Sequence, residues 1–182
     1  DEYSMGTGIN QWDTDGDSIG DKDELEGIYI DEELGTVISN PLRQDTDGDG
    51  LSDYEEVYGV NISGIGIIKT NPTLNDTDSE GLSDYEEAKI RYTNPRKQDT
   101  DGDGLTDSEE IYTYITDPRN IDTDGDMLTD WEEISGINIS GIGVVKTDPL
   151  ACDTDADGLS DYEEAYGVNI TGIGIRYTNP LR

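Results

Sequence analysis

Acidic side chains recur along this chain at a fixed spacing. Residues 45–56 read DTDGDGLSDYEE, and residues 99–110 read DTDGDGLTDSEE. Carboxylates so close together repel one another unless a cation lies between them. In the pattern D-x-D-x-D-G-x-x-D-x-x-E, side-chain oxygens at positions 1, 3, 5, 9 and 12 and the backbone carbonyl at position 7 suit one hard cation of the size of Ca²⁺. Mg²⁺ is a poorer candidate because it keeps its waters and is seldom held by so many carboxylates.

The chain contains six copies of this loop. A run of acidic residues is usually solvated surface, but that explanation does not account for one ligand spacing repeated six times. We therefore predict about six or more calcium ions, with Ile or Leu at position 7 contributing a carbonyl. The predicted ligands are, loop by loop, Asp13, Asp15, Asp17, Ile19, Asp21 and Glu24; Asp45, Asp47, Asp49, Leu51, Asp53 and Glu56; Asp76, Asp78, Glu80, Leu82, Asp84 and Glu87; Asp99, Asp101, Asp103, Leu105, Asp107 and Glu110; Asp122, Asp124, Asp126, Leu128, Asp130 and Glu133; Asp153, Asp155, Asp157, Leu159, Asp161 and Glu164.

Three loops depart from the pattern. Loop 3 has Glu80 in place of the third Asp, and loops 1 and 5 have Ser18 and Met127 at position 6. A residue other than Gly in the left-handed conformation costs about 1 kcal/mol. We expect loops 1 and 5 to bind more weakly than loops 2, 4 and 6, which match throughout.

The loops divide the chain into repeats of two lengths. We assign residues 1–12 to an N-terminal segment that is a candidate inter-subunit strand. The long repeats are 13–44, 45–75, 122–152 and 153–182, and the short repeats are 76–98 and 99–121. A Pro preceded by Asn or Asp lies four residues before five of the loops, which indicates a turn.

Each loop is expected to lead into a short helix. Capping-box patterns begin at Ser52, Ser83, Thr106, Thr129 and Ser160. Three helices are predicted to stop at Gly59, Gly136 and Gly167, in the left-handed C-terminal conformation.

The long repeats then carry an insert such as GVNISGIGIIKT from Gly59. Its apolar alternation predicts a tight hairpin turning at Ser63-Gly64, with Val60 and Ile62 facing Ile65 and Ile67. The first repeat has a variant with a longer turn. The short repeats are expected to pass from the helix directly to one strand.

Composition predicts little conventional core. Only 31% of the residues are hydrophobic, Phe is absent, and the formal net charge is -33. Such a chain is expected to be disordered without a counter-ion. The predicted fold class is an elongated repeat array held by calcium, built from small α+β units of loop, short helix and strand or hairpin.

The same composition excludes several functions. The acidic charge argues against nucleic acid and anionic membrane surfaces, and no apolar run is long enough for membrane insertion. His is absent, every acidic cluster has metal-ligand spacing, and we expect no catalysis. Cys152 is the only cysteine, so it is predicted to be a linker residue or to pair with another molecule.

The motifs DTDGDSIGD at Asp13 and DTDGDGLSDYEE at Asp45 resemble thrombospondin type 3 repeats, particularly the cysteine-free bacterial and archaeal versions. The resemblance covers nearly the whole chain. The apolar residue at loop position 7, as at Leu51, separates the pattern from an EF-hand. The resemblance implies an extracellular or cell-surface, elongated structure filled with calcium.

Two further features have competing interpretations. Asn61, Asn75, Asn138 and Asn169 lie in sequons for N-glycosylation, although Asn and Ser/Thr also suit a turn. We expect the tyrosines of the loops and helix ends, such as Tyr54 and Tyr58, to pack in small cores rather than to form a binding surface.

The leading hypothesis is a secreted calcium-binding structural protein that forms a rod. Residues 1–12 are proposed to pair with the last hairpin of a preceding copy, which would build a head-to-tail filament. The alternative is a spacer or binding module of a larger surface adhesin or secreted enzyme. A calcium sensor is disfavoured, because the chain has only two methionines to line an exposed groove.

Overall fold

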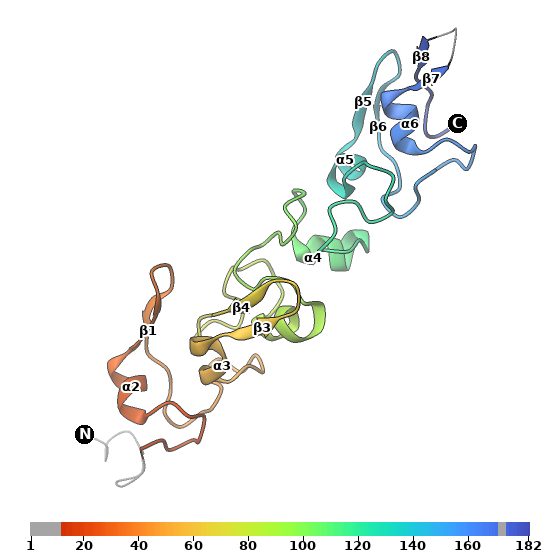
Figure 1. Cartoon of the computed structure of the whole chain (residues 1–182). Helices are drawn as coiled ribbons and strands as arrows, with labels where there is room; N and C mark the ends of the chain where they lie inside the picture. The colour runs from red at the N-terminus through yellow and green to blue at the C-terminus, as the bar shows by residue number, and fades with distance from the viewer. Residues whose placement is uncertain (1–11, 171–173) are drawn as a thin grey trace. The chain divides into compact units, whose positions relative to one another are not determined.

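The fold consists of small helices alternating with pairs of antiparallel strands (Figure 1). This computed structural model describes residues 12–170 and 174–182, and the predicted strand in residues 1–12 lies almost entirely outside them. The chain forms two compact units, one ending at Gln98 and one spanning Asp99–Arg182.

The first unit contains the first three loops. Its elements are α2 (Asp21–Glu26), β1 (Ile28–Asp31), β2 (Gly35–Val37), α3 (Asp53–Tyr58), β3 (Val60–Ile62), β4 (Gly66–Ile68) and the π-helix η1 (Glu86–Arg91). The second unit contains the other three loops. Its elements are α4 (Asp107–Glu109), the π-helix η2 (Glu110–Tyr114), α5 (Asp130–Ser135), β5 (Ile137–Ile139), β6 (Gly143–Val145), α6 (Asp161–Tyr166), β7 (Val168–Ile170) and β8 (Gly174–Arg176).

The predicted helix starts are confirmed. Complete capping boxes begin α3, α4, α5 and α6. In the third repeat Ser83 Oγ accepts the Glu86 N–H at 3.2 Å, while the Glu86 carboxylate pairs with Arg91. The turns before the loops also form, for example with the Arg43 N–H donating to the Asn40 carbonyl at 2.9 Å around Pro41.

The glycines that end the long-repeat helices are required, but in a different conformation from the predicted one. Gly59 has φ 100° and ψ 143°, which is an extended backbone with positive φ rather than the left-handed helical form. A Cβ at Gly59 would lie 2.4 Å from Ile67 Cγ2. The chain turns from helix to strand here because only Gly allows both the dihedral angles and the close approach.

The hairpins form, with a register one residue from the prediction. Val60 pairs with Ile68 and Ile62 with Gly66, which leaves a three-residue connection, 63–65. Ile67 is consequently 69% exposed. The hairpins of the fifth and sixth repeats have the same register, and β1 and β2 pair with a bulge.

The short repeats contain no strand among their described residues, so the predicted strand there is wrong. Each helix instead continues as a π-helix and ends at a residue with positive φ, Tyr92 (62°) or Ile115 (65°). The position of Gly59 is occupied by Ile90 and Thr113 in these repeats. Without Gly the chain cannot leave the helix there, and it runs on for two more residues.

Small apolar clusters replace a single core. One joins Ile19, Ile30 and Val37 of the first repeat to Val57 of the second, and another joins Leu51, Val60 and Ile62 to Ala88. In both clusters the hairpin therefore packs on the helix of the following repeat. The third cluster, around Ile139, Val145 and Ala165, repeats this arrangement in the second unit.

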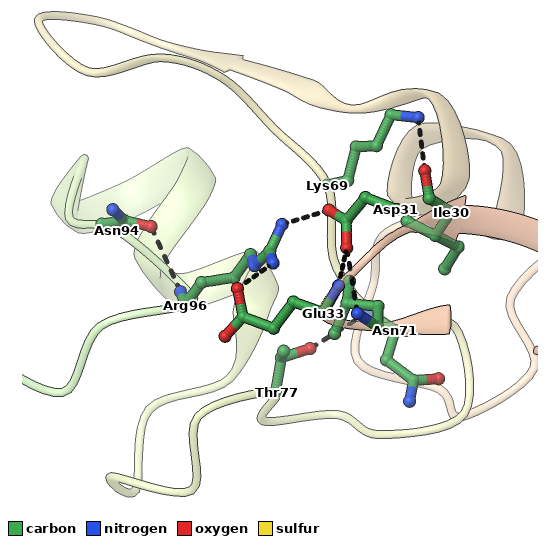
Figure 2. A network of polar contacts seen from close by, with 9 residues as sticks. Ile30, Asp31, Glu33, Lys69, Asn71, Thr77, Asn94 and Arg96 are labelled. Atoms are coloured by element: carbon green, nitrogen blue, oxygen red, sulfur yellow. Dashed lines mark hydrogen bonds and ion pairs between the residues drawn. The ribbon is translucent and has the colours of Figure 1, made fainter. Parts of the chain in front are cut away.

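A polar network also ties the first repeat to the next two (Figure 2). The Arg96 guanidinium pairs with Asp31 at 2.5 Å and also with Glu33. Lys69 Nζ donates to the Ile30 carbonyl at 3.1 Å. The β1–β2 hairpin is thus held by basic groups from two later repeats.

Candidate metal centre

The first Asp of each loop organises the backbone around it. In loop 2, Asp45 Oδ1 accepts the Gly48 N–H at 2.6 Å and Oδ2 accepts the Gly50 N–H at 3.1 Å. Both donors have positive φ, 86° and 116°. The same pair of bonds recurs in loops 1 to 5, so positions 4 and 6 both need an unusual backbone conformation.

Position 3, position 12 and, in loop 1, position 5 supply carboxylate oxygens with no donor. Asp47 Oδ2 and Glu56 Oε2 are buried without a hydrogen-bond partner. The same holds for one or more oxygens of Asp15, Asp17, Glu24, Asp78, Asp101, Glu110, Asp124, Glu133, Asp155 and Glu164. Buried anionic oxygens are stable only when a partner compensates them. A hard cation would supply that partner, so these residues fit calcium.

The structure brings many of the predicted ligands together. Ligand atoms lie within 4.8 Å of one another in the groups Asp13–Asp15–Asp17, Asp45–Asp47–Asp49, Asp78–Glu80–Glu87 and Asp99–Asp101–Asp103. Position 7 places its side chain in the interior, as at Leu51, which is fully buried. Its carbonyl stays a predicted ligand.

Position 9 also makes hydrogen bonds within its own loop, and its role as a ligand stays a prediction. The Asp53 carboxylate accepts the N–H and the hydroxyl of Thr46 at 2.8 and 2.7 Å, so it closes its own loop by hydrogen bonds. Asp53 also groups with Asp17 and Glu24 of the preceding loop, and all three are buried. This carboxylate therefore belongs to a cluster shared by the first two repeats, because the start of α3 lies against the first loop.

Two hydroxyl positions were missed in the sequence. Thr occupies position 2 of every loop and bonds the Asp at position 9 of the same loop. In the first five repeats a Ser or Thr directly before the Asn-Pro or Asp-Pro holds the Glu at position 12, as Thr70 Oγ1 does with Glu56 Oε1 at 3.1 Å. The recurring DTD and [ST]-[ND]-P motifs were the signals that could have revealed them.

Neighbouring loops are also connected through the backbone. The Tyr85 N–H donates to Asp49 Oδ2 at 2.7 Å, and the Trp131 N–H donates to Asp103 Oδ2 at 2.9 Å. The Tyr162 N–H makes the same bond to Asp126 at 2.8 Å. Since position 5 is a predicted ligand, the start of the next helix orients it.

Burial of these clustered acids changes their protonation. Desolvation, followed by the charge of Asp47, raises the pKa of Glu56 from 4.5 to about 10. Desolvation likewise raises the pKa of Glu110 and of Glu133 to about 8 and that of Asp84 to about 7. A cation among the carboxylates would reverse this effect, because it favours the charged form.

The other predicted sites have mixed outcomes. Asn61, Asn75 and Asn138 are exposed, and the side chain of Asn169 lies outside the described residues, so glycosylation stays a prediction. The expectation that tyrosines fill small cores is wrong for Tyr54 and Tyr58, which are 43% and 54% exposed and lie against each other. Cys152 is exposed. None of the described helices is long and apolar enough to cross a membrane.

Comparisons with known proteins agree with the geometry of the loops. Residues 98–182 match the family described as the clostridial binary toxin B/anthrax toxin PA Ca-binding domain, and residues 45–58 match the bacterial TSP3 repeat. A solved B domain of a biofilm associated protein is 38% identical, covers 25% of this chain and 11% of that chain, and has a TM-score of 0.25. A BSP domain of a biofilm associated protein is 35% identical over 29% of this chain and 10% of that chain, with a TM-score of 0.24. No curated protein matches the chain. The chain carries calcium-binding repeats of the thrombospondin type 3 kind.

Proposed function

We propose that this chain is a structural calcium-binding repeat module whose folded state requires the metal. The buried carboxylate oxygens without donors, two of which are Asp47 Oδ2 and Glu56 Oε2, carry this proposal. The small apolar clusters are too few to offset the repulsion among these acids. Calcium therefore supplies the interaction that holds each loop on the next repeat.

For the first loop, two cation positions fit the carboxylate groups better than one. The first lies among positions 1, 3 and 5, and the second lies where Asp17 and Glu24 meet Asp53 of the next repeat. An ion in the second position would connect successive repeats directly. Isothermal titration calorimetry and native mass spectrometry should then count more than six calcium ions, whereas six or fewer would contradict the shared position.

Scattering with and without a chelator tests the requirement for metal. In millimolar calcium the chain should be ordered, and excess EGTA at neutral pH should increase its radius of gyration substantially, with loss of amide dispersion in NMR spectra. Magnesium at the same concentration is the control, because it should not restore order. A radius of gyration that does not change on chelation would refute the proposal.

We propose an extracellular or cell-surface location. Calcium modules of this open kind bind at about 10⁻⁴ to 10⁻³ M, which fits the calcium concentration outside cells. At millimolar calcium a site at the tight end of that range contributes roughly 1.4 kcal/mol.

Head-to-tail assembly stays a proposal from the sequence alone. The alternative is that the chain acts as a spacer or binding module within a larger surface adhesin or secreted enzyme. Electron microscopy of the isolated chain in millimolar calcium separates these possibilities. Fibres that vanish on deletion of residues 1–12 would support assembly, and a persistent monomer would favour the spacer.

A further inference from the structure

A pocket of about 450 Å³ lies where the fifth and sixth repeats meet. Three aromatic residues line it: Trp131 from α5, Tyr166 from the end of α6 and Tyr177 just after β8. They are 46%, 50% and 44% exposed, respectively. These three large aromatic side chains are about half exposed and line the same pocket. Their ring faces are therefore available to a ligand.

The charge of the pocket selects the class of ligand. Glu132 contributes a carboxylate, and none of the described residues that line the pocket is basic. Glu132 lies close enough to Tyr166 that its charge, after burial, raises the pKa of the Tyr166 hydroxyl. The whole chain has a formal net charge of -33 and attracts cations. We propose that this pocket binds an organic cation of the quaternary ammonium class, held against the rings of Trp131, Tyr166 and Tyr177 with Glu132 as counter-ion.

The first two repeats provide an internal comparison. Counted from the start of each loop, Lys22 occupies the position of Trp131, and Lys69 occupies that of Tyr177. Lys22 pairs with Glu26 at 3.6 Å, and the Lys69 ammonium donates to the Ile30 carbonyl at 3.1 Å. The first pair of repeats thus places its own ammonium groups in this region. In the last pair of repeats, Trp131 and Tyr177 replace both lysines. Their rings can contact a cationic ligand that is not part of the chain.

Binding can be measured on the full chain in millimolar calcium with choline as the probe. In a Trp12→Tyr background, Trp131 is the only remaining tryptophan and reports on the pocket by fluorescence. The uncharged isostere 3,3-dimethylbutan-1-ol is the matched ligand control. Choline should change the Trp131 emission with a saturable dependence that weakens as NaCl is raised, and the isostere should bind about tenfold more weakly.

Calorimetry on variants tests the assignment of residues. Tyr177→Lys imports the residue of repeat 2 and should abolish choline binding, whereas Tyr58→Lys, at the matching helix end of repeat 2, should leave it unchanged. Glu132→Gln retains a side chain able to cap α5 and should weaken binding about tenfold. Circular dichroism in calcium checks that each variant is folded, and Tyr177→Phe, which retains a ring, should keep binding.

Three outcomes would overturn the proposal. Equal affinity for choline and its isostere would show an apolar site. Binding of neutral oligosaccharides with no dependence on NaCl would show a sugar site. Absence of saturable choline binding in the folded, calcium-loaded chain would show that the pocket takes no such cation. All three leave the calcium requirement intact, because they are measured with calcium bound.

Discussion

Individual residues in these loops adopt backbone conformations that their side chains disfavour. Ser18 and Met127 have φ 87° at position 6, where the other loops have Gly. Ser79 (φ 64°) and Ala156 (φ 62°) show the same strain at position 4, where the other loops also have Gly. The strain persists because the first Asp of the loop must receive both backbone N–H groups, as Asp122 does from Gly125 and Met127.

Relief of this strain should strengthen calcium binding in the fifth loop. We expect Met127→Gly to remove about 1 kcal/mol of strain and to raise the affinity of that site about fivefold. Terbium luminescence or calorimetric titration measures the change. Met127→Ala is the control, because it removes the side chain but keeps the Cβ, and it should gain little. A gain of equal size from both variants would assign the effect to the side chain instead.

The position-2 threonines should contribute strongly to stability, although they are not predicted metal ligands. The Thr46 hydroxyl donates to Asp53 at 2.7 Å and accepts the Asn40 N–H at 2.8 Å. Thr46→Val leaves the Asn40 N–H without this acceptor and Asp53 Oδ2 without this donor, and should destabilise the calcium-loaded chain by about 2 to 3 kcal/mol. Urea unfolding measures this, and Thr46→Ser should retain most of the stability. Unchanged stability of Thr46→Val would contradict the closing role of the hydroxyl.

The spacing of the acids predicted the loops because every ligand position lies within one twelve-residue window. The roles of Thr46 and Thr70 were not predictable in the same way. Thr46 bonds Asp53 seven residues away, and Thr70 bonds Glu56 fourteen residues away across the hairpin. The assignment of Asp53 to the preceding loop depends on the packing of two repeats, which no single window contains.

At the scale of the elements, the exit from each long-repeat helix depends on a single glycine. The sequence indicated that Gly59 ends the helix, but Ser63-Gly64 suggested a two-residue turn and hence a register one residue from the observed one. A three-residue connection places Ile68 toward the core and Ile67 outside. Short apolar runs such as GIGII are compatible with either register until the hairpin is packed on the next helix.

Gly59→Ala therefore should destabilise the second hairpin strongly. The new Cβ would lie 2.4 Å from Ile67 Cγ2 and 3.1 Å from the Ile68 carbonyl oxygen. We expect a loss of about 3 kcal/mol or more, measured by urea unfolding in calcium. Gly66→Ala is the matched control: Gly66 has φ 115°, and a Cβ there meets nothing within 4 Å. Equal losses would show that dihedral strain alone, and not the contact with Ile67, makes Gly59 necessary.

At the scale of the whole molecule, stability depends on how the buried acids are compensated. Protons and calcium compete for the same oxygens. Glu56, with a pKa of about 10 in the metal-free fold against 4.5 when it is exposed in the unfolded chain, binds a proton in the fold that the unfolded chain releases. Glu110 and Glu133, at about 8, act in the same direction.

Calcium should consequently remove most of this pH dependence. Between about pH 4.5 and 10 the metal-free fold holds more protons than the unfolded chain, so its stability should fall as the pH rises. Calcium holds the same carboxylates ionised in the folded chain, and above about pH 4.5 they are ionised in the unfolded chain as well. The stability of the calcium-loaded chain should therefore change little over this range and should fall only below about pH 4.5, where protons displace the metal. Urea or thermal unfolding at pH 5 and pH 8, on metal-stripped and calcium-loaded protein, measures both slopes. Glu56→Gln should stabilise the metal-free chain at pH 8 and weaken the calcium-loaded one. An equally steep fall of stability with rising pH in both states would show that these carboxylates are not the groups that calcium and protons share.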